Sequence, residues 1–164
     1  MSSARHAAVE EWSPHGQTGP VDLAELLQRT VRELQDAGIP DEALGILKNR
    51  RLSAPKFTPA GRAWRLGVLL LDHDARLYRI GAITRAVEPP RGVANKSAEA
   101  EERRELRRAA VRGKFAEGEV VNYGYEPFEP PVVDGVPMVP WNASGALRPL
   151  EDYLAERISL ARET

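Results

Sequence analysis

Residues 64–87 carry the pattern that most restricts what this chain can fold into. Apolar residues occupy alternate positions at the start of this segment: Trp64, Leu66, Val68 and Leu70. A two-residue period is typical of a β-strand with one face against a core, and residues 77–87 are rich in the β-branched and aromatic side chains that strands favour. The intervening Asp72-His73-Asp74-Ala75 has the composition of a turn. The sequence therefore predicts a β-hairpin, with Leu70 and Ile80 in its buried face.

Further strand signals surround this hairpin. Gly67 and Gly81 lie inside its two strands, where glycine often marks a bulge or the close approach of another backbone. A third strand is predicted over residues 120–125. Asp134-Gly135 between valines has the sequence of a two-residue hairpin turn, although Pro137 fits only an edge strand.

Four helices are predicted around the strands. In the first, apolar residues recur at helical spacing after Asp22, a potential cap, and Gly38 ends the pattern. A shorter helix over residues 41–50 would complete an N-terminal helical hairpin. A third, over residues 97–112, has acidic residues in its first turn and arginines in its last, which complements the helix dipole. The last begins near Pro149 and presents one apolar stripe.

Together these elements predict the α+β class: a small antiparallel sheet centred on the 64–87 hairpin, with the 97–112 helix inserted between strands. The 164 residues fit one domain, which we assign to residues 20–164. Residues 1–19 have no sustained period and many turn formers. We interpret them as a mobile arm that is dispensable for folding.

Composition excludes several classes of protein. Without cysteine, the chain has no disulfide framework, thiolate nucleophile or Cys-based zinc site. Its longest apolar run, Val68–Leu71, is far below the roughly 20 residues that cross a bilayer, and the N-terminus lacks the apolar core of a secretory signal. These features predict a cytoplasmic protein with no membrane partner. Nineteen of the 23 basic residues are arginine, which fits a GC-rich bacterial genome.

Net charge is concentrated in the middle of the chain. From Ala43 to Phe115 there are seventeen Lys and Arg against seven Asp and Glu, whereas the two flanks together carry six basic and seventeen acidic residues. A basic middle of this kind is expected to meet something acidic: the protein's own ends, another copy of the protein, or a polyanion.

The densest basic cluster lies on and just after the predicted 97–112 helix. Its members are Arg103, Arg104, Arg107, Arg108, Arg112 and Lys114. Several of them are four residues apart, which places like charges side by side at a cost of roughly 0.2–0.5 kcal/mol per pair. Nucleic-acid phosphate would relieve this repulsion, and so would acidic residues of the same helix or of a second subunit.

A second basic stretch, residues 48–65, is interleaved with Phe57 and Trp64. Aromatic side chains between cations can stack on nucleic-acid bases. Trp64, however, is in phase with the apolar face of its predicted strand, which favours a position in the core.

Other candidate sites carry weaker signals. Asp72-His73-Asp74 has the residue types of metal ligands, but three consecutive turn residues cannot converge on one ion, so we predict a turn and no metal or cofactor site. Four polar or aromatic residues could line a ligand pocket: Asn122, Tyr123, Tyr125 and Trp141. An exposed sheet face at an oligomer interface explains them as well. The chain has no phosphate-binding glycine loop and no hydrolase, zinc-protease or dinucleotide motif, so we predict no catalytic residue.

Our first hypothesis is therefore a non-catalytic binding or assembly protein that forms a homo-oligomer through complementary acidic and basic surfaces. One alternative is a nucleic-acid-binding protein that uses the six basic residues of the 97–114 cluster. Another is an enzyme or ligand-binding domain with a pocket near Asn122 and Trp141.

Overall fold

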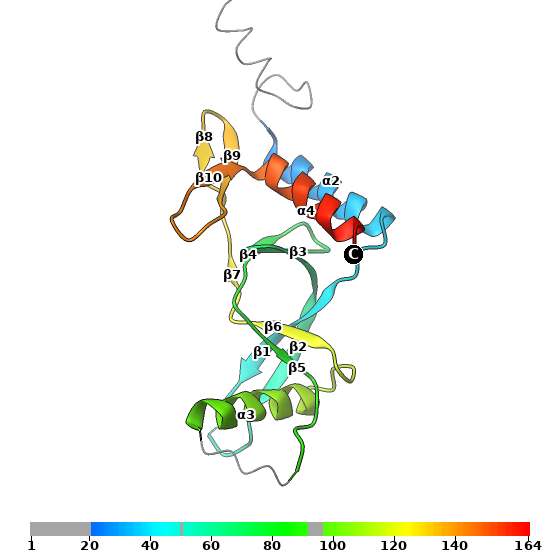
Figure 1. Cartoon of the computed structure of the whole chain (residues 1–164), viewed down its shortest axis with the longest axis vertical. Coiled ribbons are helices and arrows are strands. Elements are labelled where there is room, and N and C mark those ends of the chain that lie inside the picture. Colours follow the sequence, from blue (N-terminus) through cyan, green and yellow to red (C-terminus); the bar gives the residue numbers. More distant parts are fainter. Residues whose placement is uncertain (1–20, 50, 92–96) are drawn as a thin grey trace, which may run out of the picture.

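The computed structural model describes residues 21–49, 51–91 and 97–164, which form an α+β fold of helices and two sheets (Figure 1). The helices are α2 (Leu23–Asp36), α3 (Ala98–Arg112) and α4 (Leu150–Arg162). The larger sheet contains β1 (Glu42–Lys48), β2 (Lys56–Leu66), β3 (Leu69–Asp72), β4 (Leu77–Arg79), β5 (Ala82–Arg85), β6 (Val120–Tyr123) and β7 (Glu126–Pro127). The smaller contains β8 (Val132–Val133), β9 (Val136–Pro140) and β10 (Leu147–Pro149). The predicted fold class is confirmed, although the main sheet is larger than expected and mixed. The predicted arm, residues 1–19, lies outside the described residues.

The seven-stranded sheet closes on itself. Its hydrogen-bonded order is β5-β6-β1-β2-β3-β4-β7, and the chain joins its two ends because β4 runs on into β5 and β6 runs on into β7. Arg79 pairs with Glu126, and Ala82 pairs with Tyr123 in the same antiparallel register. β6 also pairs in parallel with β1. The strands thus form the ring at the centre of Figure 1, a small β-barrel.

Glycines occupy the point where the ladder between β4–β5 and β6–β7 is interrupted. A Cβ atom on Gly81 would lie 2.3 Å from the carbonyl oxygen of Tyr123 and 2.4 Å from the carbonyl carbon of Gly124. Gly124 has a φ of +67°, a conformation that favours glycine. The close backbone approach predicted at Gly81 is confirmed. The single strand predicted over residues 77–87 is wrong, because it divides into β4 and β5 at this point.

The strand predicted over residues 64–71 is also divided. Leu66 at the end of β2 pairs with Leu69 at the start of β3 across a two-residue turn. Gly67 occupies this turn with a φ of +65°. The sequence conceals the turn because β3 is buried along its whole length and therefore extends the apolar run. The turn predicted at residues 72–75 is confirmed.

The helix predicted over residues 41–50 is wrong, since Glu42–Lys48 form β1, and the described residues contain no N-terminal helical hairpin. One face of β1 places Ala43 against the core beneath α3, and the other places Leu44 in the barrel interior. A Cβ atom on Gly45 would lie 2.7 Å from the Val121 side chain. Packing on both faces therefore overrides the local helix propensity of this segment.

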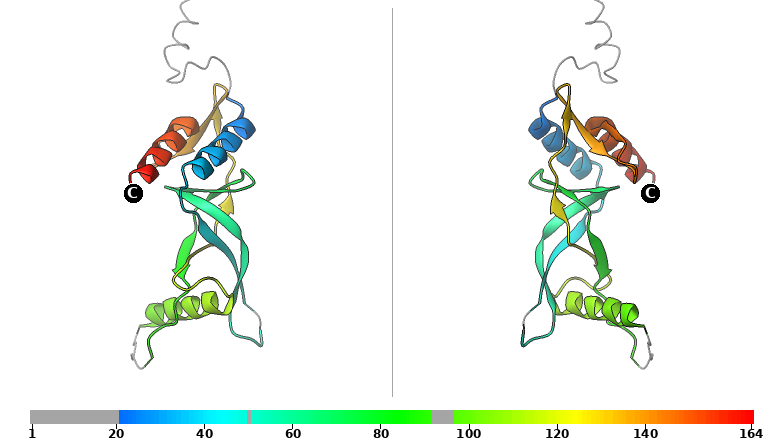
Figure 2. Two further views of the ribbon diagram at one scale, coloured as in Figure 1. Left: turned by 90° about the vertical axis from the view of Figure 1, so that its right-hand side faces the viewer. Right: turned by 90° about the vertical axis from the view of Figure 1, so that its left-hand side faces the viewer.

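The barrel lies between two helical layers, which makes the molecule elongated (Figure 2). At one end, Ala109 and Ala110 of α3 pack on Phe57 and Val121. At the other end, α2, α4 and β8–β10 lie together over a larger core of leucine, tryptophan and tyrosine side chains. The helices predicted after Asp22, over 97–112 and near Pro149 are confirmed, as is the hairpin at Asp134-Gly135.

Tyr153 of α4 ties the helical layer to the barrel. Its buried hydroxyl donates to the Leu66 carbonyl oxygen at 3.0 Å and accepts from the Val68 N–H at 2.8 Å. Both partners belong to the β2–β3 turn, so one side chain fixes this turn against the last helix of the chain.

We expect Tyr153→Phe to lower the free energy of unfolding by about 1–3 kcal/mol, because it leaves a buried N–H and C=O without their partner while the ring still fills its site. Urea denaturation measures the loss. Tyr78→Phe, which removes a half-buried hydroxyl, is the control and should cost less. Equal losses in the two variants would contradict the role given to Tyr153.

Candidate functional site

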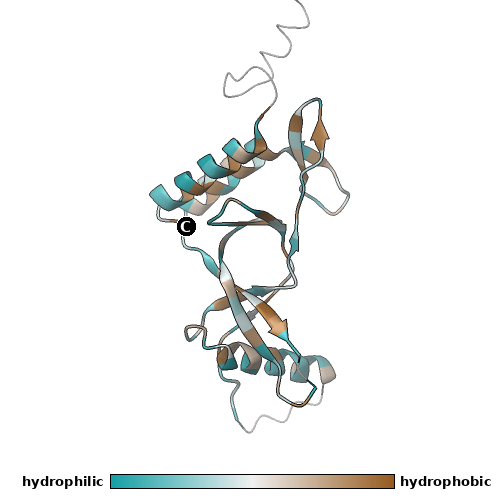
Figure 3. Ribbon diagram, turned by 180° about the vertical axis from the view of Figure 1, so that it is seen from behind, coloured by the Kyte–Doolittle hydropathy of each residue, from teal (hydrophilic) through white to brown (hydrophobic). Residues whose placement is uncertain are grey.

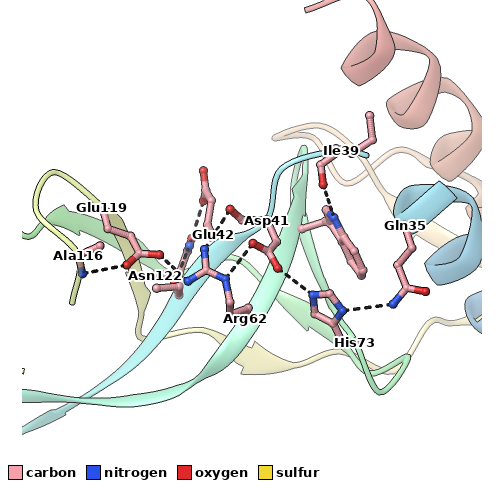
Figure 4. A network of polar contacts seen from close by, with 11 residues as sticks. Gln35, Ile39, Asp41, Glu42, Arg62, His73, Ala116, Glu119 and Asn122 are labelled. Atoms are coloured by element: carbon pink, nitrogen blue, oxygen red, sulfur yellow. Dashed lines mark hydrogen bonds and ion pairs between the residues drawn. The ribbon is translucent and has the colours of Figure 1, made fainter. Parts of the chain in front are cut away.

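A network of polar contacts extends along one side of the barrel (Figure 4). Arg62 of β2 donates to Asp41 at 2.8 Å through Nε and also binds the Glu119 carboxylate. Asp41 lies 2.8 Å from Nε2 of His73, and the Gln35 side chain lies 3.4 Å from Nδ1 of the same ring. These contacts join α2, β2, the β3–β4 turn and the segment before β6. Strong hydrogen bonds to Asp41 and Glu119 raise the pKa of Arg62.

His73 is also held by ring stacking. Its ring centroid lies 4.2 Å from that of Trp64, and the Trp64 indole N–H donates to the Ile39 carbonyl oxygen at 2.9 Å. Trp64 is buried in the core, as predicted. Both ring nitrogens of His73 have partners, so this histidine links the barrel to the helical layer.

The pKa of Asp41 reports on the same network. Burial alone would raise it, but hydrogen bonds from Arg62 and His73 outweigh burial and hold the pKa below its ordinary value of 3.8. The ionised carboxylate therefore stabilises the fold above that ordinary value. This contribution is lost as the pH falls through the lowered pKa of the folded state.

We expect Asp41→Asn to be less stable than the wild type near neutral pH, and the gap between the two to shrink as the pH falls below about 4. Urea denaturation at a series of pH values measures the gap. Asp74→Asn, at a mostly exposed carboxylate, is the matched control and should change stability little at any pH. A gap for Asp41→Asn that stays constant with pH would contradict the assignment.

The residues of the predicted turn 72–74 point in different directions. The Asp72 carboxylate accepts from the backbone N–H groups of Asp74 and Arg76 at 2.9 Å and from the Tyr78 hydroxyl at 3.1 Å. His73 instead contacts Asp41. The acidic and histidine side chains in the described ranges form no group able to hold a metal ion.

The four residues of the predicted ligand pocket lie in separate environments. Asn122 is fully buried and bridges Glu42 and Arg65 inside the barrel. The neighbouring Tyr123 packs on Phe57 beneath α3, with ring centroids 5.1 Å apart. Tyr125 meets Tyr78 edge to face, and Trp141 is exposed in the connection between β9 and β10. Burial raises the pKa of both Tyr123 and Tyr125.

The basic cluster on α3 divides into paired and unpaired residues. Arg108 and Arg112 bind Glu105 on the same helix, at 3.2 and 2.8 Å, and Arg108 also binds Glu101. A hydrogen bond from Arg112 is the main cause of the lowered pKa of Glu105. The Arg104 side chain is half-buried. The remaining three residues are exposed and belong to no ion pair among the described residues: Arg103, Arg107 and Lys114.

The second basic stretch divides in the same way. Arg62 and Arg65 are paired with acids of the barrel, and Phe57 is buried, as Trp64 is. The remaining described cations lie on and beside the loop of the β1–β2 hairpin and are exposed: Lys48, Arg51 and Lys56. Arg112 ties this loop to α3 by donating to the Pro55 carbonyl oxygen at 2.7 Å.

Charge is therefore segregated in space as well as in sequence. We define the basic end as the β1–β2 loop region (48–56) with α3 and Lys114 (98–114), which together carry ten basic and four acidic residues. The acidic end comprises α2 (21–36) and residues 128–164, with five basic and ten acidic residues. The two ends lie at opposite extremes of the long axis (Figures 1 and 2). No ion pair in the described ranges joins them.

The acidic end also exposes apolar side chains on and beside its small sheet. Val132 is 62% exposed and lies on β8, which is brown in the hydropathy colouring of Figure 3. Val133 and Leu147 are exposed as well, and the strand register places both on the outer face of the sheet, opposite the face that carries Val132 and the buried Val139. Trp141, just after β9, is also exposed. We call Val133 and Leu147 the apolar face. The chain has no basic residue from position 115 to position 147, so only acidic charges are interspersed with this face.

Comparison of the chain with models of known protein families, with curated proteins and with solved structures gave no match. None of the helices in the described ranges combines the length and apolar character that crossing a membrane requires.

Sequence reasoning missed the Asp41–Arg62–His73 network. A signal was present: residues 43–71 contain no acidic residue, whereas Asp41, Glu42, Asp72 and Asp74 flank that stretch. Once β1, β2 and β3 pair, these flanking acids meet the arginines of β2 and of the β3–β4 turn.

Proposed function

We propose that this protein is a non-catalytic assembly module, in which the basic end of one copy binds the acidic end of another. The observation that carries the proposal is the separation of the two charges along the long axis. Because the ends of one copy point away from each other, their surplus charges are available to other molecules. A second copy supplies the complementary charge at equal concentration.

The inner polar residues support a structural role rather than a catalytic one. Asp41, Arg62 and His73 are engaged with one another, and Glu42, Arg65 and Asn122 form a second closed group. Groups that satisfy each other in this way stabilise the barrel and are not poised for proton transfer to a substrate.

Salt dependence of the oligomeric state tests the proposal. We expect assembly at low ionic strength, measured by size-exclusion chromatography with light scattering, and dissociation as salt screens the two ends. The variant Arg103→Gln/Arg107→Gln removes two unpaired cations from the basic end and should weaken assembly. Arg32→Gln/Arg162→Gln makes the same charge change at the acidic end and should not. A monomer at every ionic strength, or equal weakening by both variants, would contradict the proposal.

Nucleic acid is a second candidate partner, because the β1–β2 loop region carries four basic residues and no acid. Phosphate contacts of this kind would give a log–log salt plot with a slope near −0.9 per neutralised phosphate. Titration of labelled duplex DNA and single-stranded RNA distinguishes the candidates. Binding tighter than about 1 µM near physiological salt would favour nucleic acid over self-assembly.

A further inference from the structure

The tip of the β1–β2 hairpin exposes one large apolar side chain among cations. Leu52 is 100% exposed, and Lys48, Arg51 and Lys56 lie on the same loop region. Because the Arg112–Pro55 hydrogen bond holds this loop to α3, the loop is part of the basic end and not an independent tail. Burial of this fully exposed leucine against another surface would remove its apolar area from water and would therefore be favourable.

The apolar face at the acidic end also has apolar side chains at its centre, but the charges around them are negative. Val133 belongs to the two-residue edge strand β8, and Leu147 of β10 lies on the same outer face; both side chains are 46% exposed. Glu129 and Asp134 lie on either side of β8 and are exposed. The face therefore offers apolar surface bordered by carboxylates, whereas the hairpin tip offers an apolar side chain bordered by ammonium and guanidinium groups.

We propose that the hairpin tip of one copy docks on the apolar face of the next, with Leu52 against Val133 of β8 and the cations of the tip beside Glu129 and Asp134. This inference rests on the proposed self-assembly and names its contact surfaces. The two surfaces belong to the same chain and are complementary in both charge and apolar character, which makes a second copy the occupant.

The position of the two surfaces determines the kind of assembly. Tip and face lie at opposite ends of the molecule, so an end-to-end contact joins unlike surfaces and leaves one tip and one face unoccupied. Such a head-to-tail contact propagates into a row or a ring of copies. A two-fold dimer would instead place two copies antiparallel, occupy both tips and both faces, and stop at a mass of two chains.

Mixing two defective variants tests this geometry. Leu52→Asp places a carboxylate on the tip, and Val133→Asp places one on the face; both positions are exposed, so the fold should tolerate them. Leu160→Asp makes the same change at an exposed position of α4 that belongs to neither surface, and it is the matched control. Circular dichroism checks the fold of each variant, and light scattering at low salt gives its mass.

We expect the wild type and Leu160→Asp to assemble, and Leu52→Asp and Val133→Asp each to remain monomeric. An equimolar mixture of the two defective variants should form dimers and nothing larger, because it retains one intact tip and one intact face per pair. A mixture that stays monomeric, or a Leu52→Asp variant that assembles like the wild type, would overturn the docking proposal and leave the salt-dependent assembly standing. A wild type that is monomeric at every salt concentration would overturn both.

Discussion

Replacing Leu70 with alanine is expected to lower the free energy of unfolding by about 2–5 kcal/mol. Leu70 is fully buried in the barrel interior and belongs to the small core formed with Leu44 and Ala63. The half-buried Tyr78, Ile80 and Tyr125 pack against this core, and the size of the loss depends on how far they move into the cavity that the substitution leaves. Chemical denaturation of the purified variant measures the loss.

Ile80→Ala provides the comparison for Leu70→Ala. The sequence predicts both residues in one buried face, but Ile80 is only half-buried and lies in the bend between β4 and β5. We therefore expect a smaller loss for Ile80→Ala than for Leu70→Ala. A loss near zero for Leu70→Ala would show that the barrel interior is not the core described here.

Gly81→Ala is expected to be as damaging as a large core truncation, although it adds one methyl group. The new Cβ atom would meet the backbone of Tyr123 and Gly124, which cannot rotate away as a side chain can. Overpacking against mobile side chains costs about 1–3 kcal/mol, and we expect a loss at or above the top of that range. The strands β5 and β6 would have to move apart, which would break the pairing that closes the barrel.

Gly38→Ala separates backbone strain from steric conflict. Gly38 has a φ of +64°, but a Cβ atom there would meet nothing within 4 Å. The loss at this position should be about 1–2 kcal/mol from the left-handed conformation alone. If thermal or urea denaturation finds Gly81→Ala no worse than Gly38→Ala, the close approach at Gly81 does not control barrel closure.

Local signals predicted α2, α3 and α4 correctly. Ser97 caps α3 by accepting from the Ala100 N–H at 3.0 Å, and Asp22 caps α2 by accepting from the Glu25 N–H at 3.3 Å. Each such signal lies within four residues of the group that it satisfies. The helical period after Pro149 is equally local, so α4 could be predicted without knowledge of the rest of the fold.

Elements that depend on distant partners could not be predicted in the same way. β1 is a strand because it pairs with residues 121 and 122 on one side and with β2 on the other, and its own sequence fits a helix equally well. The β2–β3 turn depends on Tyr153, more than eighty residues later. The charges could be counted in the sequence, but only the fold shows that the basic and acidic surpluses lie at opposite ends of the molecule.

Closure of the barrel by β6 has a consequence for how this chain folds during synthesis. Leu44 leaves the ribosome long before Asn122, its neighbour in the parallel pair, so the edge of β1 stays unpaired while nearly eighty further residues are made. Over that interval the nascent chain presents an open sheet edge and the partly apolar surface that α3 later covers. Pairing between residues so far apart in sequence also slows folding, because the entropy cost of closing the long loop comes before any stabilising contact forms. A nascent chain that ends before residue 120 is therefore expected to keep the edge of β1 open to pairing with other chains.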